Sequence, residues 1–123
     1  PLLDRFDLHV EVPRVSFADI AEPTEPSESA KLREAVVAAR AVQLERAGKL
    51  NARLDARGLW RVVKLGAEQR ALLKRAADRW QLSARGSLRV LKVARTIADL
   101  EQSGAVTTQH VAEALQLRCR DRA

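Results

Sequence analysis

The chain has 123 residues and a mass of 13.6 kDa, enough for one compact domain with a modest core. Hydrophobic residues make up 46% and charged residues 31%, which is the balance of a globular chain and not of a disordered one. A single Cys excludes a disulfide framework and a cysteine-based zinc site. No apolar run approaches the roughly 20 residues that span a bilayer, so we expect a cytoplasmic protein without a membrane partner.

Charge is unevenly distributed along the chain. Residues 1–30 carry two basic and seven acidic side chains, whereas residues 31–123 carry 20 basic and nine acidic ones. A positive field of this size attracts nucleic acid and nucleotide phosphates. Arg-rich helix faces that are merely solvated would give the same net charge, so charge alone leaves both interpretations open.

An alternating pattern near the N-terminus predicts one β-strand. Residues 6–12 alternate apolar and polar side chains, and Pro13 ends the pattern. The buried face would consist of Phe6, Leu8, Val10 and Val12. Because no second strand of this quality follows, we expect that residues 1–15 belong to the sheet of a larger protein.

The rest of the chain has the patterning of an all-α protein, a small bundle of about four helices. A linker over residues 16–28, in part acidic and rich in Pro and Ser, precedes a helical domain over residues 29–123. Helices are predicted over residues 29–47, 67–80, from the N-cap Ser83 to Glu101, and from Thr107 or Thr108 to Arg118, with an ambiguous short helix over residues 56–63. The first helix would bury a stripe formed by Leu32, Val36, Ala39, Gln43 and Ala47.

The chain contains no complete active site. It has no phosphate-binding loop of the form GxxxxGK[ST], and no hydrophobic strand ends in paired acids. His9 and His110 stand alone and are interpreted as surface residues, so no metal ligands are predicted. Cys119 has no neighbouring His or Asp that would make it a nucleophile.

Two arginines occupy unusual positions. Arg5 lies at the entrance of the predicted strand, and Arg85 lies in the first turn of a helix, two residues after Ser83. A cation is mildly unfavourable there, because the N-terminal end of a helix carries positive partial charge. The same place suits an anion, since free N–H groups and a guanidinium can converge on a phosphate. A solvated Arg85 without a ligand remains the alternative.

Several motifs in order resemble the magnesium chelatase-like AAA+ ATPases, and within them the ComM (YifB) type. Residues 1–10 resemble the LLDRFxLHV segment of that family and the PLLSRFD segment of minichromosome maintenance helicases. Residues 50–54 match LNAxL, residues 83–101 match SARxxxRxLKVARTIADLE, and residues 110–118 match HxxEALxxR. The resemblance covers nearly the whole chain. It departs from the family at Gly86-Ser87, where relatives carry a bulkier pair, which bears on the packing beneath Arg85.

The resemblance implies that this chain is mostly the helical lid of a ring-forming ATPase. It implies that Arg5 is the arginine finger, acting in trans on a neighbour's γ-phosphate, and that Arg85 is the sensor 2 arginine, in cis or in trans. ATP and Mg²⁺ would bind to the full-length protein, and the partners would be neighbouring subunits of a homo-oligomeric ring, expected to be a hexamer. Without Walker A and B motifs, this chain alone should bind neither and be inactive. The helix at 29–47 would be the insertion that repositions the lid.

The same resemblance implies two functions, and the residues allow a third. The first is DNA handling in transformation and recombination, with non-specific DNA or phosphate contacts at Arg70, Lys74 and Lys92. The alternative is the ATPase subunit of a metal chelatase. A stand-alone helical interaction domain is the second alternative, which leaves the predicted strand unexplained.

Overall fold

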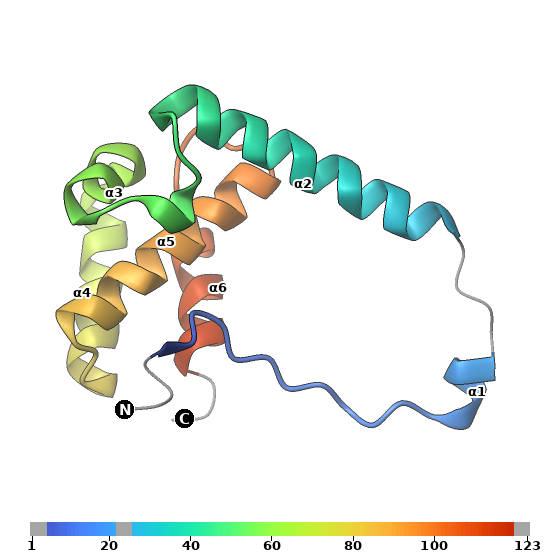
Figure 1. Cartoon of the computed structure of the whole chain (residues 1–123). Helices are drawn as coiled ribbons and strands as arrows, with labels where there is room; N and C mark the ends of the chain where they lie inside the picture. Colours follow the sequence, from blue (N-terminus) through green and yellow to red (C-terminus); the bar gives the residue numbers. More distant parts are fainter. Residues whose placement is uncertain (1–4, 22–25, 120–123) are drawn as a thin grey trace.

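The computed structural model describes residues 5–21 and 26–119, which form six α-helices and one 3-10 turn and contain no strand. The elements in chain order are α1 (Phe17–Ala21), α2 (Pro26–Ala47), η2 (Asn51–Arg53), α3 (Ala56–Val63), α4 (Ala67–Trp80), α5 (Ala84–Leu100) and α6 (Thr108–Cys119) (Figure 1). The all-α fold predicted from the sequence is therefore confirmed.

Helix α5 lies at the centre of the bundle. It packs against α6, α2, α3 and η2, while α4 packs against α6 (Figure 1). Its core face consists of Val90, Leu91, Ala94 and Ala98, each at most 1% exposed. These positions recur at helical spacing, so one face of a single helix supplies the middle of the core. The surrounding helices contribute Leu59, Val63, Leu73, Val111 and Leu115.

The boundaries of α3 and α5 are set by side-chain caps. Ser83 Oγ accepts a hydrogen bond from the Gly86 amide at 3.0 Å, as predicted, and Asp55 Oδ1 accepts one from the Gly58 amide at 2.8 Å. A Cβ added at Gly86 would lie 3.3 Å from Ser83 Oγ, which is tighter than ordinary contact. Gly86, where the chain departs from the family pattern, thus allows the capping hydroxyl of Ser83 to approach the helix closely, next to Arg85 in the sequence.

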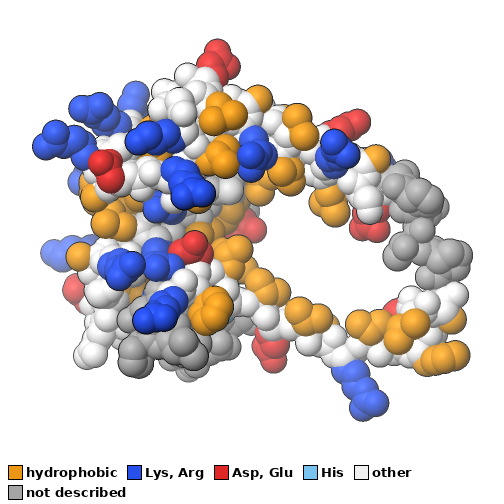
Figure 2. Space-filling view, in the orientation of Figure 1, with side chains coloured by type: hydrophobic (Ala, Val, Ile, Leu, Met, Phe, Trp, Pro, Cys, Tyr) orange, Lys and Arg blue, Asp and Glu red, His pale blue; other side chains and the backbone are white. Residues whose placement is uncertain are grey.

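Helix α2 is only half covered by the bundle. It begins at Pro26, three residues before the predicted start, and ends at Ala47 as predicted. Ala39 and Gln43 are buried, but Leu32 and Val36, earlier on the same stripe, are 64% and 48% exposed. The predicted buried stripe is therefore correct for Ala39 and Gln43 only. The N-terminal half of the helix extends beyond α5 (Figures 1 and 2), and Ala47, the last residue of the helix, is exposed.

The N-terminal arm (residues 5–16) is extended, and its distal part runs away from the bundle (Figure 1). The four apolar side chains of the predicted strand are 50–77% exposed, and orange side chains line this stretch in Figure 2. A strand needs a neighbouring strand to satisfy its amides and carbonyls. The described residues provide none, so strand pairing with a larger protein stays a prediction. The linker predicted over 16–28 contains the short helix α1 and the start of α2.

Candidate functional site

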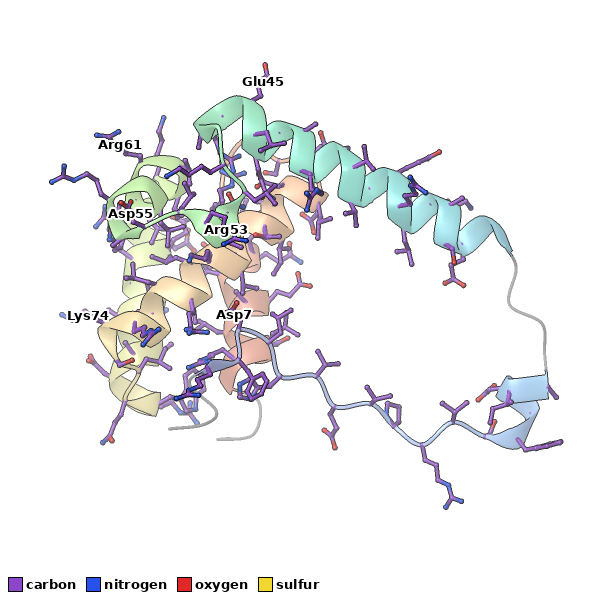
Figure 3. The ribbon with its side chains drawn as sticks, in the orientation of Figure 1. Asp7, Glu45, Arg53, Asp55, Arg61 and Lys74 are labelled. Atoms are coloured by element: carbon purple, nitrogen blue, oxygen red, sulfur yellow. The ribbon has the colours of Figure 1, made fainter. Side chains whose placement is uncertain are left out.

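The first residues of the arm are fastened to α5 and α6. Arg89 Nη1 donates to the Arg5 carbonyl at 3.0 Å and forms an ion pair with Asp7 Oδ1 at 2.7 Å. Arg118 Nη1 donates to the carbonyl of Phe6, and the His9 amide donates to the carbonyl of Leu117 at 2.8 Å. Figure 3 shows Asp7 beside the lower half of α5. Segments 80 residues and more apart in sequence thus meet at one end of the bundle.

The structure places both predicted phosphate-binding arginines at this end of α5. Arg85 is the second residue of α5, one turn before Arg89, which holds the Arg5 backbone. Both side chains are exposed. Within residues 5–21 and 26–119, neither guanidinium has a hydrogen-bond or ion-pair partner. Two exposed cations, Arg85 on α5 and Arg5 on the arm, are therefore connected through Arg89.

The three candidate DNA contacts are not a single cluster. Arg70 and Lys74 are exposed one turn apart on α4, and Lys74 projects from the outer side of the bundle (Figure 3). Arg70 also stacks over Trp60, with its guanidinium carbon 5.7 Å from the ring centroid. Lys92 is half-buried on α5, where its Nζ lies 3.4 Å from the Ala52 carbonyl.

A buried polar group around Asp99, here called the Asp99 cluster, joins α2, η2 and α5. The carboxylate accepts two hydrogen bonds from Arg46 and one from Asn51, all at 2.9 Å, and forms an ion pair with Arg95 at 3.0 Å. Asn51 in turn donates its amide to Gln43 Oε1 at 2.9 Å. Asp99 is 1% exposed and Arg95 2%. Every oxygen of this buried carboxylate is satisfied, so the cluster fixes how the three elements pack.

The environment of Asp99 favours its charged form. Burial alone would raise the pKa of Asp99, but hydrogen bonds from Arg46 and Asn51 and the charges of Arg95 and Arg46 hold that pKa below its usual value. Burial lowers the pKa of Arg95, and the charge of Asp99 opposes that shift. Arg95 also donates to the Ser103 carbonyl at 2.7 Å, which fastens the loop after α5. The cluster therefore joins α2, η2, α5 and the loop after α5.

His110 is not the surface residue that the sequence predicted. It is 4% exposed, accepts the Thr107 amide at Nδ1 (2.9 Å), and places Nε2 2.6 Å from Glu101 Oε2. The ring therefore links the start of α6 to the end of α5. His9 is half-buried in the arm, and the side chain of Cys119 lies outside the described residues.

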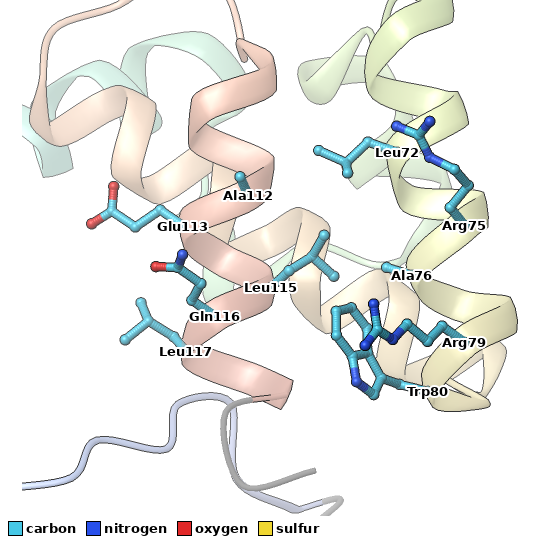
Figure 4. Close-up of a pocket in the computed structure, with 10 residues that line it drawn as sticks. All are labelled: Leu72, Arg75, Ala76, Arg79, Trp80, Ala112, Glu113, Leu115, Gln116 and Leu117. Atoms are coloured by element: carbon cyan, nitrogen blue, oxygen red, sulfur yellow. The ribbon is translucent and has the colours of Figure 1, made fainter. Parts of the chain in front are cut away.

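A groove with a volume of about 1010 Å³ is lined by residues of α4 and α6 (Figure 4). Leu72, Ala76 and Trp80 line one side, and Leu115 and Leu117 line the other. Arg79 stacks over Trp80, with its guanidinium carbon 5.4 Å from the ring centroid. The groove is apolar with a basic edge on α4 and carries no catalytic constellation.

The described residues contain neither a cluster of metal-binding side chains nor a membrane-spanning helix. No group of three or more His, Cys, Asp or Glu side chains in residues 5–21 and 26–119 could hold a metal ion. In the same residues, no helix is both long and apolar enough to cross a membrane.

Comparison with known proteins places the chain in a family. The profile of the magnesium chelatase subunit ChlI C-terminal family matches residues 26–118, which include all of α2 to α5 and nearly all of α6. The chain belongs to this family. It is 42% identical over 119 residues to competence protein ComM of Haemophilus influenzae, covering 96% of the chain and 23% of that relative. It is 42% identical over 123 residues to protein YifB of Escherichia coli, covering 99% of the chain and 24% of that relative. The chain thus spans about a quarter of the length of the relatives it matches.

The sequence motifs lie in segments that the structure shows to be important for packing, but the motifs alone do not indicate the roles of several of their residues. Asn51, Arg95 and Asp99 lie in the matched motifs and form the Asp99 cluster. Arg89 lies one turn after Arg85, and only the fold shows that it meets the arm. An (i, i+4) Arg95–Asp99 spacing on the apolar face of a predicted helix is the one signal that could have indicated a buried ion pair.

Proposed function

We propose that this chain is the lid portion of a ring-forming AAA+ ATPase that supplies two arginines to bound nucleotide. The observation that carries the proposal is the contact between the Arg5 carbonyl and Arg89, one turn from Arg85. Exposed guanidinium groups suit phosphate oxygens, because a planar fork of donors matches them and the point charge of Lys does not. Membership of the magnesium chelatase family supports the same assignment.

In this proposal each arginine has a separate role. Arg5 is the arginine finger, which reaches the γ-phosphate of ATP held with Mg²⁺ by the phosphate loop of a neighbouring subunit. Arg85 is the sensor 2 arginine. Because the Arg5 backbone is held by Arg89, one turn after Arg85 on α5, the contacts favour a single neighbouring nucleotide for the two side chains. Phosphoryl transfer depends on positioning and charge neutralisation, and a finger arginine is worth roughly 10³–10⁵ in rate.

Mutation of each arginine in the longer parent protein tests these roles. We expect that Arg5→Ala and Arg85→Ala each strongly reduce ATP hydrolysis, with the helical fold unchanged by circular dichroism. The matched control is Arg61→Ala, an exposed arginine of α3 that points away from the bundle (Figure 3). Mixing Arg5→Ala subunits with subunits inactivated in the phosphate loop should restore activity, since each supplies what the other lacks. Wild-type turnover by Arg5→Ala and Arg85→Ala would refute the proposal.

The partner proposed for the ring is DNA, bound through its phosphates without sequence preference. Support comes from the excess of basic side chains over residues 31–123 and from the exposed pair Arg70 and Lys74 on α4. The chain has only two Trp, two Phe and no Tyr, so few side chains could stack on bases. Contacts to phosphate alone predict an affinity that falls steeply with salt.

A salt titration of the parent protein with nucleotide tests DNA binding. The double variant Arg70→Glu/Lys74→Glu should weaken binding to single and double strands and flatten the slope of log K against log salt by about 1.4–1.8, since each phosphate contact contributes roughly 0.7–0.9. Arg33→Glu, an exposed reversal on α2, is the matched control. Absence of binding even at low salt would favour the metal chelatase alternative.

A further inference from the structure

Two further arginines hold the arm against the C-terminal helices. Arg89 has only 18% of its side chain exposed and contacts both the Arg5 carbonyl and the Asp7 carboxylate. Arg118 is 8% exposed and donates to the Phe6 carbonyl. We call Arg89 and Arg118 the arm clamp. The function proposed above uses Arg89 only as the contact that places the Arg5 backbone, and it gives Arg118 no role.

The clamp makes two contacts with backbone carbonyls of the arm and one with a side chain, the carboxylate of Asp7. Carbonyl oxygens of two successive residues, Arg5 and Phe6, each accept from a different guanidinium, and the His9 amide donates to Leu117. Three anchors across five residues fix the direction of the chain and leave the Arg5 side chain exposed. Hydrogen bonds from a charged donor are roughly twice as strong as neutral ones.

The clamp also connects the arm that carries Arg5 to the helix that carries Arg85. Arg89 follows Arg85 by one helical turn, about 6 Å along the axis of α5, and its guanidinium holds the Arg5 carbonyl. Any rotation of α5 must then carry Arg5 with it. Without the clamp, the arm would lose its described contacts with α5 and could move independently of Arg85.

We propose that Arg89 and Arg118 are positioning residues that fasten the arm to the lid, so that Arg5 and Arg85 move as one unit toward a nucleotide. The expected effect on catalysis rests on the ATPase function proposed above. The contacts of the arm clamp, in contrast, can be measured without ATP hydrolysis. A displacement of about 1 Å in a positioned group can cost roughly a hundredfold in rate. Loss of the clamp should therefore act on kcat and leave KM for ATP unchanged.

Amide hydrogen exchange in the parent protein tests the clamp directly. Arg89→Ala should speed exchange at the His9 amide by about tenfold or more, because the loss of charge-assisted bonds frees the arm. Amides in the core of α5 and α6 should exchange as in wild type, and Arg61→Ala should leave His9 unchanged. Wild-type exchange at His9 in Arg89→Ala would overturn the clamp whatever the protein catalyses.

Kinetics and subunit mixing test the positioning role. Arg89→Ala should lower kcat by about tenfold to a hundredfold with KM retained, and Arg89→Lys should recover part of it. Subunits inactivated in the phosphate loop should rescue Arg89→Ala as they rescue Arg5→Ala, which loss of folding would not allow. Asp7→Asn, which leaves the helices untouched, should give a change of about twofold to fivefold in the same direction. Normal kcat in Arg89→Ala, together with a defective Arg5→Ala, overturns the positioning role and leaves the proposed function standing.

Discussion

Replacement of Asp99 by Asn is the sharpest test of what holds this fold together. The change keeps the size of the side chain but removes its charge and turns one acceptor oxygen into a donor. In the Asp99 cluster that NH₂ group would face guanidinium or amide donors from Arg46, Asn51 or Arg95, with nothing to accept its hydrogens. The variant therefore leaves buried donors without partners.

The magnitude follows from the contacts that are lost. At least two charge-assisted hydrogen bonds disappear, each worth about 1.5–3 kcal/mol, and breaking one side of a buried pair costs about 3–5 kcal/mol. Arg46 is 24% exposed in its side chain, so water can compensate part of its loss, whereas Arg95 at 3% has no such relief. We expect Asp99→Asn to lower the free energy of unfolding by about 3 kcal/mol, equivalent to about 12–24 °C in Tm.

Urea denaturation followed by circular dichroism and by Trp60 and Trp80 fluorescence measures this loss. Asp78→Asn is the matched control, since Asp78 is exposed on α4 and should change stability by less than about 0.5 kcal/mol. The double variant Arg46→Ala/Asp99→Asn should be less destabilised than the sum of the single changes by about 1 kcal/mol or more. A stability of Asp99→Asn within about 1 kcal/mol of wild type would refute the reasoning.

The remaining predictions concern acid, the capping residues and the arm. Because the pKa of Asp99 is depressed in the fold, its stabilisation is complete above the unfolded value of about 3.9 and is lost as pH falls through the folded pKa. The difference between wild type and Asp99→Asn should thus be constant from pH 7 to 5 and shrink below pH 4 in urea titrations. His110→Ala should cost about 1–3 kcal/mol, and Glu101→Gln less than about 1, because that carboxylate is 60% exposed. Ser83→Ala should cost about 1 kcal/mol and Ser83→Gly only a few tenths, measured by thermal melting. Deletion of residues 1–21 should cost about 1 kcal/mol or less, and a large drop in Tm would show that the arm belongs to the core.

Helix positions could be predicted because their signals are local. Ser83 is a capping residue directly before the apolar pattern of α5, and the same hydrogen bond to Gly86 that the pattern indicates is present in the fold. Residues 67–80 were predicted as a helix with the bounds that the structure has. Signals of this kind depend on residues three or four positions apart, which a sequence reveals directly.

Burial of polar residues could not be predicted, because their partners are distant in the sequence. Asp99 is bound by Arg46 and Asn51, which are 53 and 48 positions away. His110 reads as a lone polar residue until the loop after α5 returns and brings Glu101 within 2.6 Å of its ring. A charged or polar residue is usually exposed, so the sequence favours the surface unless a partner is known. The error at His110 follows from that rule, and the Asp99 cluster was missed for the same reason.

The fold also changes what the basic charge of this chain means. Arg46 and Arg95 bind the buried Asp99, while Arg89 and Arg118 bind backbone carbonyls of the arm. Arginine suits these places because its rigid fork satisfies several acceptors while it stays charged. Positive charge in residues 31–123 therefore does two different things: part of it assembles the domain, and part of it is left on the surface. Only the second part can attract phosphate from solution, so net charge overstates the field that DNA would meet.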